Sequence, residues 1–310
     1  ANLGYIVHRE SGTALVNRAP AFAMMLYTMP VTFLLAFALG LIPLAIALRG
    51  RRPAAILVTC WIAVVGGRLV LPGAVNFDGV RHFLELFPPM ALVGGNGIQW
   101  ISRKITSARG SHATGQIFRV AITALLLVPV LTATAFVHPF EATYWNFVAG
   151  GLRGAMMRGL PQASDYWAAS YRLGLRWLDV NAPHGSILAV PVAEHTVRIV
   201  APYRLRSDIG LVHLTNAWSP RINRAALEEL RRSSVTRPVY VMFVLRREWT
   251  NELMLECMRG LQPAVTWQVD GAPVLVIYRY QRAEAVGDSL SRQPALSERP
   301  EAIASRENDR

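Results

Sequence analysis

The chain has 310 residues, of which 52% are hydrophobic and 17% are charged, and its formal net charge is +12. A half-apolar composition is expected when membrane spans are joined to a soluble part. The charge does not indicate nucleic-acid binding, because Lys104 is the single lysine and arginine-rich usage more often reflects genome composition. Cys60 and Cys257 form neither a disulfide framework nor a CxxC metal site, so a cysteine-rich secreted scaffold is also excluded.

Four apolar segments follow one another in the first half of the chain. The first runs without a charged residue and exceeds the roughly 20 residues that cross a bilayer core. The second is interrupted by Arg68, and the third carries Glu85. We therefore predict an α-helical membrane region over residues 21–137, with about four transmembrane helices. The predicted spans are 21–48, 54–71, 83–101 and 120–137.

The connections between these segments differ in charge. Arginine and lysine gather in the first and third connections, as Arg49, Arg51, Arg52, Arg103, Lys104, Arg109 and Arg119. The second connection carries Arg81, offset by Asp78. Short loops rich in Arg and Lys stay in the cytoplasm. The pattern predicts a multi-pass protein of the inner (plasma) membrane, with residues 1–20, the connection 72–82 and everything after 137 on the extracytoplasmic side.

The beginning of the chain bears on this topology. Ala1 is not a start methionine, and the first apolar run is much longer than the core of a signal peptide. A first span that enters from the extracytoplasmic side needs an earlier span to carry it there. We therefore expect further spans upstream, so that this chain is a fragment of a longer protein.

After the last span the pattern becomes that of a soluble domain, which we place at residues 138–282. Short β-branched runs alternate with helical periodicity, which predicts a small α/β domain. Asp270-Gly271 between two strands indicates a hairpin. Residues 283–310 offer almost nothing to bury and are predicted to be a disordered tail. The predicted helices are 166–180, 219–232 and 248–258, and the predicted strands are 186–191, 209–214, 238–245, 265–269 and 274–280.

The most unusual polar cluster stands where the third span begins. Arg81 and His82 open that span at its extracytoplasmic end, and Asp78 precedes them. A guanidinium at the lipid–water boundary suits a phosphate, which it can grip by paired hydrogen bonds. The alternative is structural: Asp78 caps the helix, and Arg81 pairs with Glu85 four residues later. His82 alone is more typical of an interfacial hydrogen-bonding residue than of a ligand.

Other candidate residues also allow two interpretations. Arg68 either extends its guanidinium to the membrane surface or adds a second positive charge to a phosphate site. His138 and Glu141 either shape the turn out of the membrane or take part in a site. Asp165 and Trp167 either cap and pack a helix or contact a sugar by hydrogen bonding and ring stacking.

Several short motifs, taken in order, resemble one family. Residues 78–84 (DGVRHFL), followed by Pro88-Pro89 and a glycine-rich span, are similar to the late membrane segments of GT-C glycosyltransferases of family 39. That family includes protein O-mannosyltransferases and the lipid A aminoarabinose transferase. The motif HPFE at 138–141, with Tyr144, Asn146 and Gly150-Gly151, resembles the exit segment of bacterial members. Asp165-Tyr166-Trp167 and Ser170 continue the likeness, which spans roughly residues 20–280.

The resemblance implies transfer of a sugar from a polyprenyl-phosphate carrier to a lipid, glycan or protein acceptor at the extracytoplasmic membrane face. It implies that Arg81, with His82, Asp78 and Arg68, holds the donor phosphate. Glu141, Tyr144, Asp165 and Trp167 are then candidates for sugar or acceptor contact. The catalytic acidic residue of such enzymes lies in their first extracytoplasmic loop, so it is expected in the missing N-terminal part. No metal ligand or organic cofactor is indicated, and a divalent-cation requirement stays open.

Two other function classes compete with this one. A non-catalytic membrane anchor could present the α/β domain for binding a glycan or a partner protein. A transporter is disfavoured, because the spans lack the paired interrupted helices and further buried charges that transporters use.

Overall fold

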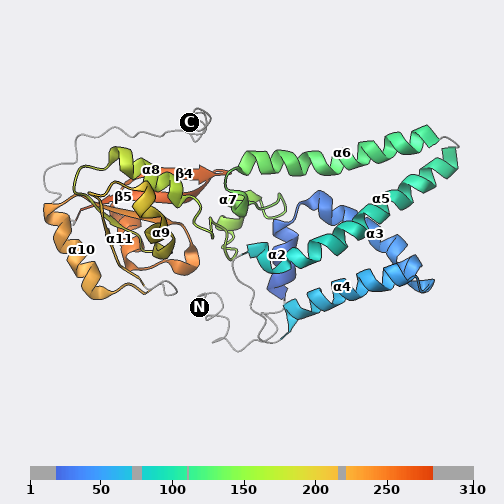
Figure 1. Cartoon of the computed structure of the whole chain (residues 1–310), viewed down its shortest axis with the longest axis horizontal. Helices are drawn as coiled ribbons and strands as arrows, with labels where there is room; N and C mark the ends of the chain where they lie inside the picture. Colours follow the sequence, from blue (N-terminus) through green and yellow to red (C-terminus); the bar gives the residue numbers. More distant parts are fainter. Residues whose placement is uncertain (1–18, 72–78, 110–111, 216–220, 282–310) are drawn as a thin grey trace. The chain divides into compact units, whose positions relative to one another are not determined.

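A computed structural model describes residues 19–71, 79–109, 112–215 and 221–281. They form two compact units, whose boundary falls between Ala155 and Met156. The first is helical, and the second is built on a five-stranded sheet (Figure 1). The prediction of apolar helices followed by a small α/β domain is therefore confirmed at this level. The predicted tail 283–310 lies outside the described residues.

The helical unit consists of long helices joined by short helical segments. The turn between α3 and α4 and the turn between α5 and α6 lie at the same end, on the right of Figure 1. We call this the turn end. The opposite end, where α2 meets η1 and the last turn of α4, is the η1 end. The elements are α2 (Ala19–Thr28), α3 (Val31–Arg49), α4 (Pro53–Val70), η1 (Gly79–Leu86), α5 (Phe87–Arg109), α6 (His112–Val137), η2 (Glu141–Thr143) and α7 (Gly151–Met157), which crosses the unit boundary.

Two predicted spans differ from the observed helices because of proline. The continuous first span, 21–48, is wrong: α2 ends at Thr28 and α3 begins at Val31. Pro30 lacks an N–H and disfavours a helical conformation at Met29, so the helix breaks there. The third span begins with the 3-10 helix η1, and α5 starts at Phe87 rather than at residue 83. Pro88 and Pro89 then lie in the first turn of α5, where proline costs no hydrogen bond.

Two described helices are long and apolar enough to cross a membrane, α3 and the stretch Gly115–Val137 of α6. The apolar part of α4, Pro53–Leu69, is shorter. Helix α5 has sufficient length, but Asn96, Gln99 and the basic residues near its end make it more polar. Two of the four predicted spans therefore have the character of membrane helices by themselves.

Helices α3 and α5 run parallel and approach closely through glycine. A Cβ at Gly40 would overlap the carbonyl group of Val93, and one at Gly97 would lie 2.6 Å from the backbone nitrogen of Gly40. A Cβ at Gly94 would also contact the α3 backbone at Ala36. Small residues allow helix backbones to meet in this way, as is common in membrane helices. The glycines of the stretch 94–97 thus allow close packing of α3 and α5.

The α/β unit contains one sheet with the strand order β2-β1-β3-β5-β4. Strands β1, β2 and β3 are parallel, whereas β5 pairs antiparallel with both β3 and β4. The central strand β3 is buried along its whole length, as its run of β-branched and aromatic residues predicts. The strands are β1 (Ile187–Ala189), β2 (Gly210–Val212), β3 (Val239–Val244), β4 (Pro263–Val269) and β5 (Ala272–Tyr280).

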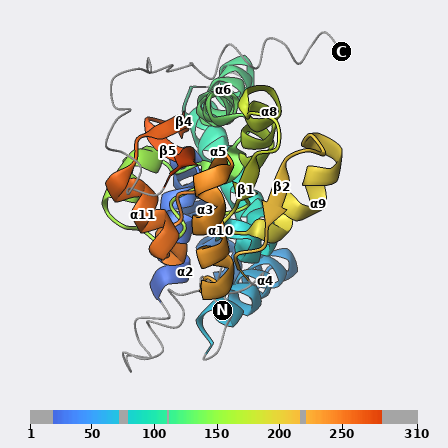
Figure 2. The same ribbon diagram turned by 90° about the vertical axis from the view of Figure 1, so that its left-hand side faces the viewer.

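Two helix pairs accompany this sheet. Helix α8 (Tyr171–Asn181) packs against β3 and β5 and also against α9 (Glu194–Arg204). Helix α10 (Arg224–Thr236) is joined to α11 (Glu252–Gly260) by an ion pair between Arg231 and Glu256. The crossovers from β1 to β2 and from β2 to β3 run in opposite directions, so right-handed connections put α9 and α10 on opposite faces. In Figure 2, α10 and α11 lie toward the centre and left of this unit, and α9 lies to the right.

The five predicted strands are all present, and the Asp270-Gly271 hairpin is confirmed with positive φ angles at both residues. The helix starts were less accurate. Helix α8 begins at Tyr171 instead of 166, and α11 begins after its N-cap Asn251 instead of at 248. Helix α10 begins after Asn223, whose side chain accepts the N–H groups of the first turn, and not near Pro220.

Candidate functional site

The η1 end is organised by a cluster of apolar side chains. Because α2, α4, η1 and the start of α5 all contribute to this cluster, the polar residues on those elements are held at fixed positions relative to one another. Methionine supplies much of the contact, filling gaps between helices of uneven shape. The buried members are Met25, Met29, Val65, Leu69, Phe83, Leu86 and Met90.

Arg68 of α4 forms an ion pair with Glu85 of η1. A guanidinium nitrogen lies 3.1 Å from a carboxylate oxygen of Glu85, and both side chains are more than half exposed. Neither of the two roles predicted for Arg68 involved Glu85. The sequence-based alternative to a phosphate site had paired Glu85 with Arg81. The pair joins residues 17 apart, so it arises only once α4 packs against η1. It also neutralises the positive charge of Arg68 at this end.

Arg81 lies on η1, four residues before Glu85, and its side chain is half-buried. The structure therefore brings Arg81 and Arg68 onto neighbouring packed elements, as a shared phosphate site would require. Asp78 lies outside the described residues, and the side chain of His82 lies outside them as well. Their predicted roles stay predictions.

His138 and Glu141 follow α6 and form a second pair. The Nδ1 atom of His138 lies 2.6 Å from a carboxylate oxygen of Glu141, and both side chains are exposed. The hydrogen bond to His138 lowers the pKa of Glu141. Tyr144 is half-buried nearby in sequence, and burial raises the pKa of its hydroxyl. The carboxylate of Glu141 thus stays ionised and accessible, as a sugar-binding group would need to be.

Asn146 fixes this segment to the helices and was not singled out for such a role from the sequence. Its amide nitrogen donates to the carbonyl oxygens of Leu26 and Met29, at 2.6 and 2.8 Å. Its amide oxygen accepts the N–H groups of Val148 and Ala149. The side chain is therefore saturated, and it satisfies carbonyls left open where α2 ends before Pro30. This explains why residues 138–155 belong to the helical unit, although the sequence grouped them with the α/β domain.

Asp165 and Trp167, the candidates in the α/β unit, differ in accessibility. Asp165 is buried, and its carboxylate accepts the backbone N–H of Ser170 at 2.6 Å, just before α8. This geometry favours the capping interpretation over sugar contact. Trp167 is 53% exposed, and its ring packs against that of Tyr166 at a centroid distance of 6.1 Å.

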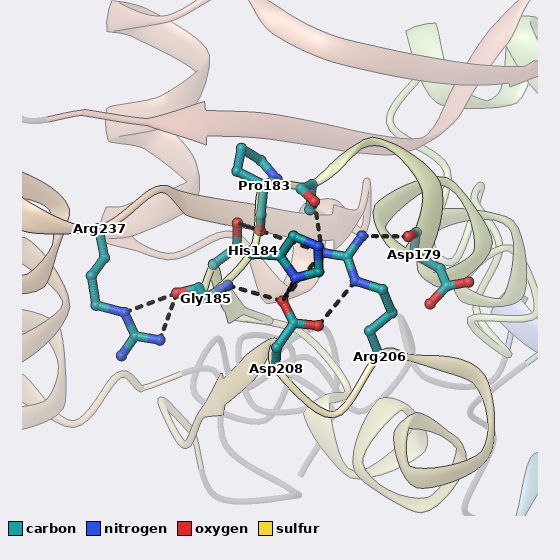
Figure 3. Close-up of polar contacts among 9 residues, drawn as sticks. Asp179, Pro183, His184, Gly185, Arg206, Asp208 and Arg237 are labelled. Atoms are coloured by element: carbon teal, nitrogen blue, oxygen red, sulfur yellow. Dashed lines mark hydrogen bonds and ion pairs between the residues drawn. The ribbon is translucent and has the colours of Figure 1, made fainter.

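A denser polar network lies before β1, at the amino end of the strand (Figure 3). Arg206 forms an ion pair with Asp208 at 3.0 Å and donates to the carbonyl oxygens of Asp179 and Ala182 at 2.7 Å. The hydrogen bond from Arg206 and a second one from the backbone N–H of Gly185 lower the pKa of Asp208. Arg237 donates two hydrogen bonds to the carbonyl oxygen of Gly185. Because these groups are used in tying loops together, we assign them a structural role.

Buried polar residues beyond the carboxyl end of β1 also have structural partners. Glu194, which opens α9, accepts the N–H of Leu214 at 3.0 Å and lies 2.6 Å from Nδ1 of His213. The hydroxyl of Tyr171 donates to the carbonyl oxygen of Val192 at 2.5 Å, and burial raises its pKa. The contacts of Glu194 join the segments that follow β1 and β2, and the bond from Tyr171 joins α8 to the loop after β1.

Cysteine and metal chemistry receive little support from the described residues. Within them, no three His, Cys, Asp or Glu side chains lie close enough together to hold a metal ion. Both cysteines are free thiols, and burial raises the pKa of Cys257 to about 12. Cys257 is therefore an unreactive core residue.

Comparison with known proteins gives no assignment. The chain matches no family model, no curated protein and no solved structure.

Proposed function

We propose that this chain is part of an integral-membrane glycosyltransferase that takes its sugar from a polyprenyl-phosphate donor. In this proposal α3, α4, α5 and α6 all cross the membrane, with the turn end in the cytoplasm and the η1 end on the extracytoplasmic side. The support is the distribution of charge along the unit. Arg49, Arg51 and Arg103 stand at the turn end, which suits the cytoplasmic side of a membrane.

Arg81 is the proposed phosphate-binding residue. A sugar that leaves a lipid phosphate passes through an oxocarbenium-like state while negative charge grows on the departing oxygen. A fixed guanidinium stabilises that charge more than it stabilises the ground state, so it speeds the reaction. The observation that carries the proposal is the half-buried Arg81 on η1, a helix that Phe83 and Leu86 hold in the apolar cluster at one end of the unit.

The neighbouring groups have secondary roles in the proposal. Asp78 and His82 orient Arg81 or the sugar, as predicted from the sequence. Arg68 is balanced by Glu85, so it tunes the charge around Arg81 rather than binding the phosphate alone. Glu141 accepts hydrogen bonds from the sugar or the acceptor, and the ionised, exposed state of its carboxylate supports that role.

Donor turnover by the full-length protein in membranes tests this function. Replacing Arg81 by Ala should lower the rate about a hundredfold, which corresponds to roughly 3 kcal/mol of lost transition-state stabilisation. Arg81→Lys should recover part of the rate, since the lysine ammonium keeps the positive charge but cannot form the bidentate hydrogen bonds that a guanidinium makes to a phosphate. Arg51→Ala at the turn end is the matched control and should retain activity. Equal rates for wild type and Arg81→Ala would leave Arg81 a structural residue only.

A second function, a membrane-anchored glycan-binding module, is favoured by the exposed Trp167 beside Tyr166. Aromatic rings that stand in solvent can stack on sugars with little reorganisation. If this is the main function, Trp167→Ala should abolish glycan binding by the whole protein while Arg81→Ala leaves that binding unchanged. The opposite result favours the enzyme.

A further inference from the structure

The two faces of the α/β unit differ in surface charge. Helices α8 and α9 expose Arg172, Arg176, Arg198 and Arg204. Their two acidic residues are Asp179, which is half-buried, and Glu194, which is 1% exposed and paired with His213. The α8–α9 face therefore presents arginines that nearby surface carboxylates do not balance.

Helices α10 and α11 are the internal comparison. Together they carry four arginines and four glutamates, at 224, 231, 232 and 259 and at 228, 229, 252 and 256. Arg231 is paired with both Glu228 and Glu256. The α10–α11 face is thus electrically balanced, although it belongs to the same unit and has the same number of arginines.

Helix α9 also exposes apolar side chains between its arginines. Ile199 is 69% exposed and Tyr203 is 85% exposed, and their spacing of four residues puts both on one side of the helix. Arg198 and Arg204 flank them. Exposed apolar rings and chains between arginines are typical of helices that lie in the headgroup layer of a membrane.

We infer that the α8–α9 face rests on an anionic membrane surface, with Ile199 and Tyr203 entering the headgroup layer. Charge complementarity favours this occupant, because the arginines match the phosphates of anionic lipids. Tethering favours it too. The unit follows α6, whose apolar stretch is long enough to cross a membrane, so a lipid surface lies within reach of the chain. The inference does not depend on the proposed enzymatic function.

Lipid-depth quenching in the reconstituted full chain tests this inference. Tyr203→Cys carries an environment-sensitive fluorophore, in a background where Cys60 is replaced by Ala and the remaining thiol, Cys257, is buried. The matched control is a label at Val235 of α10, which is 77% exposed. In vesicles containing phosphatidylglycerol, the label at 203 should shift to the blue and be quenched by lipids spin-labelled near the headgroup, whereas the label at 235 should show neither effect.

Charge variants decide whether the contact is electrostatic. Arg172→Glu with Arg176→Glu should reduce the quenching at 203, by about fivefold in the contact equilibrium for each arginine removed. Arg224→Glu with Arg232→Glu on α10 should not reduce it. Vesicles of pure phosphatidylcholine, or 1 M salt, should weaken the contact because charge attraction is lost or screened. Equal quenching at 203 and 235, or no quenching at 203, overturns the inference. A blue shift at 203 without lipid quenching also overturns it, since the face is then covered by protein.

Discussion

At the turn end of the helical unit, Arg49, Arg51 and Arg103 form no ion pair within the described residues. At the η1 end, Arg68 is paired with Glu85, and His138 is paired with Glu141. Arginines without carboxylates keep their water and act through net charge, which orients helices in a membrane. Paired groups have lower net charge but defined positions. In the proposed topology the net charge of the turn end keeps that end in the cytoplasm, whereas the paired groups of the η1 end hold defined positions.

The largest expected effect on stability comes from breaking the η1 end at Asn146. Asn146→Ala would leave the carbonyl oxygens of Leu26 and Met29 without their amide donor. It would also remove the side-chain acceptor of the Val148 and Ala149 N–H groups, although Ala149 keeps its bond to the backbone carbonyl of Asn146. Each buried group left unsatisfied costs about 1–3 kcal/mol, so we expect a loss of roughly 3 kcal/mol or more. Thermal unfolding in detergent measures this loss. Asn181→Ala, which removes an exposed hydrogen bond to Trp177, is the control and should shift the midpoint little. Similar midpoints for both variants would show that Asn146 does not hold this end together.

Disturbing the contact between α3 and α5, midway between the two ends of the unit, should have the next largest effect on stability. Gly97→Ala places a methyl group against the backbone of Gly40, which cannot move aside, and overpacking of this kind costs about 1–3 kcal/mol. Gly95→Ala, two residues earlier on α5, meets nothing within 4 Å and should cost nothing. Unfolding midpoints in detergent compare the two. If Gly95→Ala destabilises as much as Gly97→Ala, the parallel contact of α3 with α5 is not the source of stability.

Removing the negative charge at the η1 end gives a smaller and more specific effect. Glu85→Gln should change the free energy of unfolding by less than about 1 kcal/mol, because the Arg68–Glu85 pair is exposed and screened. The substitution removes one negative charge from the η1 end, so the KM for a polyprenyl-phosphate donor should fall. Steady-state kinetics at low and high salt measure this change. A KM that rises would mean that Glu85 contributes to donor binding directly.

The smallest effect concerns the His138–Glu141 pair. Because the pKa of Glu141 is lowered in the folded protein, the pair stabilises the fold above the usual pKa of a glutamate, near 4.5. That stabilisation is lost as the pH falls through the lowered value. The difference in unfolding midpoint between wild type and His138→Ala should therefore be smaller at pH 3 than at pH 6. In a Glu141→Gln background the two midpoints should agree at both values.

Local sequence signals predicted much of the fold. The five strands and the Asp270-Gly271 hairpin followed from β-branched runs and turn residues. Pro88-Pro89 marks the place in the third span where η1 ends and α5 begins. The same logic applied to Pro30 would have divided the first span, but the length of the apolar run outweighed a single proline. The start of α10 was predicted too early, because Pro220 also suits the first turn of a helix. The helix in fact begins after Asn223, whose side chain caps it.

The site was less predictable, because its contacts join distant parts of the chain. Glu85 lies at a helical spacing from Arg81, so sequence spacing pairs these two, yet packing of α4 against η1 gives Glu85 to Arg68 instead. The bonds from Asn146 to Leu26 and Met29 cross about 120 residues. Asp165 was recognised as a helix-start residue, but its burial, which argues against sugar contact, is set by the tertiary fold.

Sidedness labelling tests the central proposal most directly, because donor binding at Arg81 requires the η1 end to face the extracytoplasmic side. Arg81→Cys and Arg51→Cys are treated with a membrane-impermeant thiol reagent in intact cells, in a background where Cys60 is replaced by Ala and the remaining thiol, Cys257, is buried. Phe147, which is 77% exposed, supplies a second η1-end position in case the variant at 81 folds poorly. We predict labelling at 81 and 147 in intact cells, and labelling at 51 only after the cells are opened. Labelling of 51 in intact cells, with 81 and 147 protected, would contradict the proposal.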